Sequence, residues 1–290
     1  MADCEERHWH APDGVPLFAR DYAAADGAAR LPVICIHGLT RNSRDFEELA
    51  PLLAATGRRV LAVDVRGRGR SGRSDDPMRY QLPVYVRDML ALLDALGIAR
   101  AHFIGTSMGG LITMLLAARR GRAVASAILN DVGPEIDPAG IARIAGYAGQ
   151  PVTLDTWDDA VAYFKRTSAV AFPGLSEDGW RTLAGRGCTA DAQGRPVFDY
   201  DPSIAVPIRA KPLPRRSLLV WLLFLKLARR HPTLLIRGEL SDLLSRPIAE
   251  KMRRAAPHMA YAEIAGVGHA PLLSEDEARR AILDFLDPLP

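Results

Sequence analysis

Residues 102–111 read HFIGTSMGGL, and the interpretation of the whole chain begins from this stretch. Its first residues are β-prone, and the apolar run that follows, 111–118, has the length and content of a buried helix. Between them lies a G-x-S-x-G pattern centred on Ser107. A serine on such a sharp turn adopts a strained backbone angle, so its neighbours must lack bulk. The pattern therefore predicts an exposed Ser107 hydroxyl at the carboxyl edge of a sheet, with a helix N-terminus behind it that favours negative charge.

The composition predicts a globular protein. Hydrophobic residues make up 48% of the chain and charged residues 24%, which is enough apolar material for a sizeable core. The formal net charge is only +3, and the basic residues occur in scattered pairs rather than in one stripe with interleaved aromatics. We therefore expect no nucleic acid as a partner.

Cysteine usage and the N-terminus favour a cytoplasmic location. Cys4, Cys35 and Cys188 are odd in number and far apart, without a C-x-x-C motif, so neither a disulfide framework nor a metal site is expected. The charged N-terminus lacks the apolar core of a secretory signal. The longest apolar run, 218–225, is well short of the roughly 20 residues that span a bilayer, so we predict a buried helix there and no membrane partner.

The order of the predicted elements indicates an α/β fold with one insertion. An Asp13-Gly14 turn predicts a hairpin over residues 6–22. Further strands are predicted at 32–38, 59–64, 102–105, 124–130, 233–238 and 260–264, with helices between them. From 134 to 230 the chain has helical segments broken by prolines and no clear strand of a parallel sheet. We therefore predict a core formed by 1–133 and 231–290, and a cap formed by 134–230.

A hydroxyl nucleophile needs a base and a carboxylate that orients the base. With a strand–turn–helix elbow of the kind predicted around Ser107, both are expected downstream of the serine. His269 lies in a glycine-rich loop directly after the last strand and suits the role of base. Two aspartates follow strands, Asp242 after 233–238 and Asp131 after 124–130. We favour Asp242 as the acid, with Asp131 as the alternative and Glu239 as a minor third choice.

Taken together, the motifs resemble those of the α/β-hydrolase superfamily over nearly the whole chain. The likeness rests on His37-Gly38, on the D-x-R-G-x-G-x-S loop at 64–71, on the elbow at 105–110 and on Gly268-His269. It implies a mostly parallel eight-stranded sheet flanked by helices, with a mainly helical cap. It also implies that the backbone amides of Leu39 and Met108 form the oxyanion hole, and that no cofactor or metal is required. The commoner family pattern has the acid where this chain has Ser241, one residue before Asp242.

Two further expectations concern the surroundings of the nucleophile. The glycine-rich loop 65–72 has four arginines nearby but lacks the lysine and spacing of a phosphate-binding loop, so we interpret it as a structural turn. Aromatic residues of the cap could line an apolar acyl pocket. The residues predicted to bind substrate are His37, Gly38, Trp157 and Trp221.

The predicted activity is hydrolysis of a carboxylic ester or lactone with a small to medium apolar acyl group, through an acyl-enzyme on Ser107. Three alternatives use the same residues. The first is a C–C bond hydrolase of a vinylogous diketone acid, for which Arg143 or Arg166 could bind the carboxylate. The others are a cofactor-free haloperoxidase and a low-turnover ligand receptor. The expected partner is a small molecule, and a homodimer is the candidate assembly.

Overall fold

The computed structural model describes residues 4–25, 30–210 and 217–290, and it contains an eight-stranded sheet. The strand order is β1-β2-β4-β3-β5-β6-β9-β10. The pairs β1–β2 and β2–β4 are antiparallel and all others are parallel. The strands are β1 (Glu5–His10), β2 (Pro16–Tyr22), β3 (Val33–Ile36), β4 (Val60–Asp64), β5 (Ala101–Thr106), β6 (Val124–Asn130), β9 (Thr233–Gly238) and β10 (Ala260–Ile264). This confirms the predicted α/β fold and the opening hairpin.

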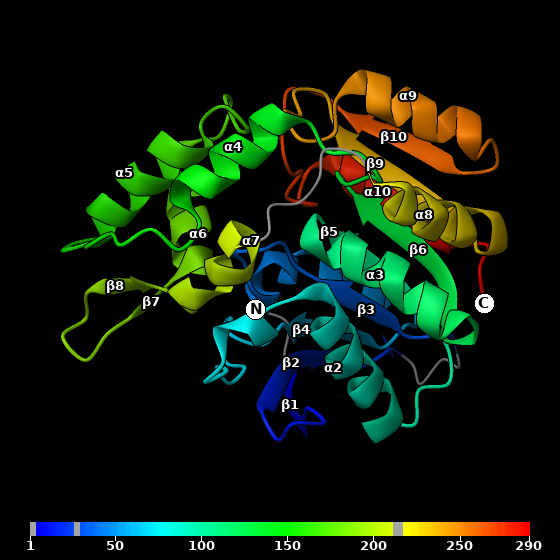
Figure 1. Cartoon of the computed structure of the whole chain (residues 1–290), viewed down its shortest axis with the longest axis horizontal. Helices are drawn as coiled ribbons and strands as arrows, with labels where there is room; N and C mark the ends of the chain where they lie inside the picture. The colour runs from blue at the N-terminus through cyan, green and yellow to red at the C-terminus, as the bar shows by residue number, and fades with distance from the viewer. Residues whose placement is uncertain (1–3, 26–29, 211–216) are drawn as a thin grey trace.

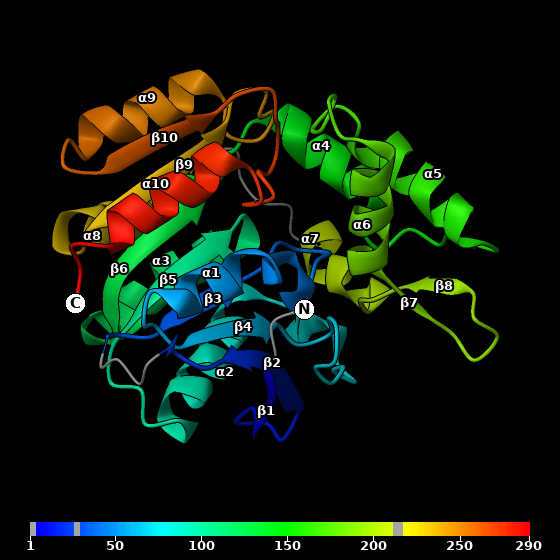
Figure 2. The ribbon, with the colours of Figure 1, turned by 180° about the vertical axis from the view of Figure 1, so that it is seen from behind.

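Helices cover both faces of the sheet (Figures 1 and 2). The inner strands are buried on both faces, and their side chains alternate between two cores: Ile34 and Ile36 join one, Val33 and Cys35 the other. The helices of the first core are α2 (Leu82–Ala95), α3 (Met108–Arg119), α8 (Leu218–Arg230) and α9 (Arg246–Ala255). Those of the second are α1 (Leu49–Ala55) and α10 (Asp276–Leu286). Among the described residues, short 3₁₀ helices connect several of these elements: η2 (Ser43–Phe46), η3 (Pro77–Arg79), η4 (Gly121–Ala123) and η5 (Pro202–Ala205).

A separate group of helices projects beyond the sheet (Figure 1). It consists of α4 (Pro138–Tyr147), α5 (Trp157–Ser168), α6 (Glu177–Gly187), the β7–β8 hairpin (Cys188–Ala190 and Pro196–Phe198) and α7 (Val206–Ala210). This group has a small core of its own, in which Phe172 packs against Trp180. No helix in the described ranges is long and apolar enough to cross a membrane.

The last helix of the predicted cap lies with the core instead. Trp221, Phe224 and Leu227 of α8 are buried in the core that contains α3, whereas Leu218 and Leu219 on the opposite side are exposed. The apolar run at 218–225 predicts a buried helix but does not indicate which element it packs against. In the structure, one face of this helix packs on α3. Tyr200 and Ile204, which precede α7, are buried in the same core. Residues 211–216 lie outside the described part of the chain.

Candidate active site

The elbow is formed where β5 ends at Thr106 and α3 begins at Met108. Ser107 lies between them with φ 51° and ψ −111°, a strained conformation for a residue with a side chain. A β-carbon on Gly105 would collide with the backbone of the next helical turn, and one on Gly109 would collide with the carbonyl of Ile36. The two glycines thus allow the turn to pack tightly against β3.

Ser107, His269 and Asp131 form one hydrogen-bonded chain. The Oγ of Ser107 is 3.0 Å from Nε2 of His269, and Nδ1 of His269 is 2.8 Å from Oδ2 of Asp131. The carboxylate accepts a hydrogen bond from Nδ1–H, which assigns the tautomer and leaves Nε2 to accept a hydrogen bond from the serine hydroxyl. Ser107, His269 and Asp131 follow β5, β10 and β6, whose carboxyl ends lie at the same edge of the parallel sheet.

The expectation that Asp242 contacts the histidine is wrong. Asp131 is fully buried, and its Oδ1 accepts from the amide of Gly238 at 3.0 Å. Asp242 instead faces the cap, where Nε and Nη2 of Arg143 donate to its carboxylate at 2.6 and 2.8 Å. Burial raises the pKa of Asp242, but the hydrogen bond and charge of Arg143, together with the charge of His269, outweigh burial, and the pKa lies below its ordinary value. The Glu239 carboxylate accepts from the amide of Gly266 at 2.9 Å and is not the partner of His269 either.

Ser241 connects the loop after β9 to Asp131. This residue has the place in the loop after β9 where the resembled family commonly has its acid. Its Oγ donates to Oδ2 of Asp131 at 2.6 Å and accepts from the amides of Leu243 and Leu244 at 3.3 and 3.0 Å. The serine thus connects the loop to a carboxylate that comes from the neighbouring strand, β6.

Arg68 connects the two residues expected to form the oxyanion hole. Its Nε donates to the carbonyl of Leu39 at 2.9 Å, and its Nη2 lies 3.5 Å from the sulfur of Met108. The side chain is fully buried, and its Nη1 donates to the hydroxyl of Tyr85 at 2.9 Å. The loop 65–72 is therefore a structural turn, as predicted, but one of its arginines also fixes Leu39 beside Ser107. A buried arginine cannot be recognised from a D-x-R-G-x-G-x-S pattern alone.

A pocket of about 120 Å³ lies between this edge of the sheet and the cap. Ser107, His269, Gly38 and Leu39 line its floor. The cap contributes aromatic and hydroxyl side chains, namely Tyr147, Tyr163, Phe164, Thr167, Ser168, Phe172, Phe198 and Tyr200. Because an engineered cavity of about 150 Å³ is known to hold benzene, the space suits a short acyl group.

Gly38 alone of the four residues predicted to bind substrate lines this pocket. Trp157 is 39% exposed at the start of α5. Trp221 packs in the core, where its Nε1 donates to Glu135 at 2.8 Å. The positions of Trp157 and Trp221 depend on how their helices pack, which cannot be predicted from the presence of an aromatic residue in the sequence. Of the other cap aromatics, Phe164 does line the pocket.

His37 has a structural position beneath the pocket. It is fully buried, its Nε2 accepts from the amide of Val65 at 3.0 Å, and its Nδ1 is 2.7 Å from the carbonyl of Gly38. Burial lowers the pKa of His37 to about 3, so the ring is neutral near pH 7. The neutral ring joins the strand ends of β3 and β4 below Gly38.

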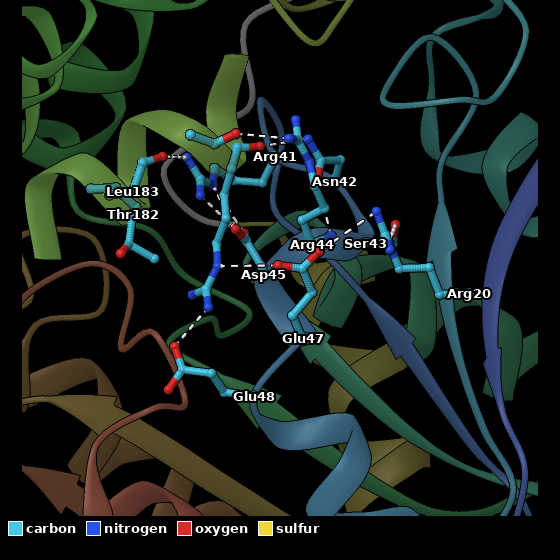
Figure 3. Close-up of polar contacts among 12 residues, drawn as sticks. Arg20, Arg41, Asn42, Ser43, Arg44, Asp45, Glu47, Glu48, Thr182 and Leu183 are labelled. Atoms are coloured by element: carbon cyan, nitrogen blue, oxygen red, sulfur yellow. Dashed lines mark hydrogen bonds and ion pairs between the residues drawn. The ribbon is translucent and has the colours of Figure 1, made fainter. Parts of the chain in front are cut away.

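The loop after β3 is also bonded to the cap (Figure 3). Arg41 pairs with Asp45, and its Nη1 lies 3.4 Å from the carbonyl of Leu183. Arg44 donates to the carbonyls of Gly185 and Cys188 at 2.7 and 2.9 Å. These acceptors are at the C-terminal end of α6, where carbonyls lack helical partners and favour cations. One side of the cap is therefore attached to the same loop that contains Leu39.

Comparison with known proteins agrees with this architecture. A family model described as the alpha/beta hydrolase fold matches residues 32–276. The chain is 37% identical over 246 residues to the 3-hydroxybutyrate-oligomer hydrolase of Cupriavidus necator, and the alignment covers 82% of each protein. A crystal structure of an α/β hydrolase from Novosphingobium aromaticivorans is 43% identical over 100% of both chains, with a TM-score of 0.93.

A more distant likeness concerns the fold alone. The structure of E-2-(acetamidomethylene)succinate hydrolase is 23% identical, covers 98% of this chain and 100% of its own, and has a TM-score of 0.82. The family model covers most of the chain, and the Cupriavidus relative is well above 30% identical over most of both proteins. This chain therefore belongs to the α/β-hydrolase family and is a hydrolase of that family.

Proposed function

We propose that this protein is a carboxylic ester hydrolase that uses Ser107 as nucleophile, His269 as general base and Asp131 as the orienting acid. The observation that carries the proposal is the continuous Ser107–His269–Asp131 hydrogen-bonded chain at the floor of a pocket. Nucleophilic catalysis by a hydroxyl requires this combination of an adjacent base and a third group that orients it.

The proposed reaction uses these groups in sequence. Ser107 Oγ attacks the ester carbonyl while Nε2 of His269 takes the hydroxyl proton, and Asp131 stabilises the resulting imidazolium. The amides of Leu39 and Met108 donate to the oxyanion, and Met108 is available because the first N–H groups of a helix have no helical acceptor. The departing alcohol receives the proton from His269. Water, activated by the same histidine, then releases the acid from Ser107.

The substrate we favour is an ester of a short acid, of the kind named for the Cupriavidus relative, an oligomer of 3-hydroxybutyrate. The small pocket supports a short acyl group, and its wall of tyrosine, threonine and serine side chains supports one that has a polar substituent. This revises the expectation of a purely apolar acyl pocket. Lactones undergo the same chemistry and are included in the proposal.

The first test is a time course of p-nitrophenol release from p-nitrophenyl butyrate, with the protein mass recorded in parallel. We expect sustained release with no accumulated butyryl adduct. A Ser107→Ala variant should reduce the rate to the background level. Release of a single equivalent with a stable adduct on Ser107 would contradict ester hydrolysis, because it would mean that water is not activated.

A second comparison distinguishes ester cleavage from C–C cleavage. Arg143 lines the pocket and could bind a dienoate acid, whereas Arg166 lies over the ring of Tyr163 on an exposed part of α5. We expect linear 3-hydroxybutyrate esters to be hydrolysed and a vinylogous diketone acid to keep its absorbance. Loss of that absorbance with no ester turnover would favour the C–C hydrolase.

A further inference from the structure

One wall of the pocket is polar, and neither the triad nor the oxyanion hole uses it. Arg41, Arg143 and Tyr147 all line the pocket. Arg143 and Tyr147 are four residues apart on α4 and so share one face of that helix. Burial raises the pKa of the Tyr147 hydroxyl, and the charges of Arg143 and Arg41 act in the opposite direction. The tyrosine therefore lies within the field of both guanidinium groups.

This wall is next to the reacting atoms. The Cγ of Arg41 and the Cβ of Ser107 are each 3.8 Å from the position that a β-carbon on Gly38 would take. Arg143 is held by Asp242, the residue after the serine that bonds to Asp131. Arg41 thus approaches from the oxyanion side, and Arg143 from the side of the acid.

Each arginine keeps part of its guanidinium for a ligand. Asp45 accepts from Nε and Nη2 of Arg41, and Asp242 accepts from Nε and Nη2 of Arg143. In both pairs the acid leaves the Nη1 group of its arginine unused. One of the two N–H bonds of Arg41 Nη1 is directed to the carbonyl of Leu183 at 3.4 Å, which leaves the other for a ligand. A carboxylate on the Nε edge holds the planar guanidinium in one orientation, so that Nη1 is directed by the pair.

The charged groups of the lining favour an anion. Within the described residues, the pocket is lined by the guanidinium groups of Arg41, Arg143 and Arg186 and by one carboxylate, that of Asp45. Arg186 donates to Glu48 on the outer side of the loop and is the least available of the three. A neutral ligand at this wall would leave N–H and O–H donors without acceptors, which is unfavourable in a buried site.

We propose that Arg41, Tyr147 and Arg143 form a carboxylate-binding subsite, and that the preferred substrates are short esters with a free carboxylate near the scissile bond. The terminal acid of a linear hydroxy acid oligomer is such a group. The guanidinium groups can only donate hydrogen bonds, and the Tyr147 hydroxyl can donate one. An ionised carboxylate only accepts hydrogen bonds, so it suits this set of donors. The inference rests on the proposed ester hydrolysis for its substrate class, but its binding test does not need turnover.

The binding test uses the full-length Ser107→Ala protein and two ligands. One is the linear dimer of 3-hydroxybutyrate with its free carboxylate, and the other is the same dimer with that carboxylate converted to a primary amide. By titration calorimetry we expect the acid to bind at least about tenfold more tightly, as for a charge-assisted pair. Equal affinities for the acid and the amide would overturn the subsite.

Variants identify the residues responsible. In the Ser107→Ala background, Arg143→Gln should bring the acid-to-amide ratio close to one, and Tyr147→Phe, which removes one hydroxyl, should reduce it several-fold. An Arg143→Gln/Asp242→Asn double variant controls for the carboxylate that loses its partner. Arg166→Gln is the matched control: it also removes one guanidinium from the cap, outside the pocket, and should keep the ratio. A ratio that stays high in the Arg143 and Tyr147 variants would contradict the assignment.

Kinetics separates failure of the subsite from failure of the proposed function. With wild-type protein we expect kcat/KM for ester cleavage to be about tenfold higher for the acid than for the amide, mainly through KM, since the charge is bound before and after the chemical step. Hydrolysis of p-nitrophenyl butyrate without any preference for the acid would remove the subsite and leave the esterase. Tighter binding of the acid without turnover of any ester would support the subsite and remove the esterase.

Discussion

The hydroxyl of Ser241 donates a 2.6 Å hydrogen bond to Oδ2 of Asp131, the same oxygen that accepts from His269 at 2.8 Å. A side chain from the loop after β9 thus supports the proposed acid, which comes from the end of β6. Ser241 and His269 both donate hydrogen bonds to the Asp131 carboxylate. Several experiments follow from this arrangement.

Asp131→Asn should lower kcat for p-nitrophenyl butyrate by about 10⁴-fold, the loss seen when a triad acid becomes an amide and the histidine tautomer is wrong. Asp242→Asn should change kcat by less than about tenfold, because that carboxylate bonds to Arg143 and not to the histidine. Steady-state kinetics on both variants, with circular dichroism as a folding control, checks the ranking. The opposite ranking would return the acid to Asp242.

Ser241→Ala should lower kcat/KM roughly tenfold, since a hydrogen bond to a charged group is worth about 1.5–3 kcal/mol and its loss leaves Asp131 less well held. Ser241→Thr retains the hydroxyl and is the matched control. Equal loss in both variants would mean that the effect comes from loop packing and not from the hydrogen bond.

An acid moved to position 241 should partly replace the native one. The Asp131→Asn/Ser241→Asp double variant tests this. The hydroxyl of Ser241 lies 2.6 Å from the Asp131 carboxylate, so a carboxylate at position 241 would lie close to the native one. We expect kcat at least about tenfold above that of Asp131→Asn alone, by restoring an anion near His269. The single variant Ser241→Asp should be impaired, because two carboxylates would face each other. A double variant no better than Asp131→Asn would show that the loop cannot direct an acid toward the ring.

Arg68→Met should lower kcat by about 10²-fold with a smaller effect on KM, because a displaced oxyanion donor weakens only the transition state. Arg68 bonds to the carbonyl of Leu39 and contacts Met108, so its loss frees both. Arg70→Met in the same loop is the control, since Arg70 is half-exposed and pairs with Glu6 at the surface. Comparable losses in the two variants, measured at equal folded fractions, would contradict the role of Arg68.

Acidification should destabilise the fold through His37. Burial lowers its native pKa to about 3, whereas an unfolded histidine titrates near 6.5. Below pH 6.5 the unfolded chain therefore binds a proton that the native state does not. The free energy of unfolding should fall by up to about 1.4 kcal/mol per pH unit toward pH 3 from this group. Urea unfolding of wild type and His37→Gln across pH 4–7 should give a smaller slope for the variant, and the exposed His258→Gln should leave the slope unchanged.

Most of the core could be predicted because its signals are local. Ile34 and its neighbours are apolar on both sides of the strand, and Gly105 and Gly109 have no alternative at the elbow. His269 could be predicted because the loop that contains it follows directly from a strand. Where prediction went wrong, the deciding contact joins distant segments: α8 packs on α3, and Trp221 bonds to Glu135.

The choice between Asp131 and Asp242 shows most clearly where prediction from the sequence ends. The sequence by itself determined that Ser107 follows β5 on a turn only glycines permit, that His269 follows the last strand, and that Asp131 and Asp242 both follow strands. Only the tertiary structure shows that Asp131, and not Asp242, contacts His269. The loop after β9 turns Ser241 toward Asp131 and Asp242 toward Arg143 on the cap. The direction of a side chain in a loop depends on which segments pack against that loop, and the residues next to it in the sequence do not determine those contacts.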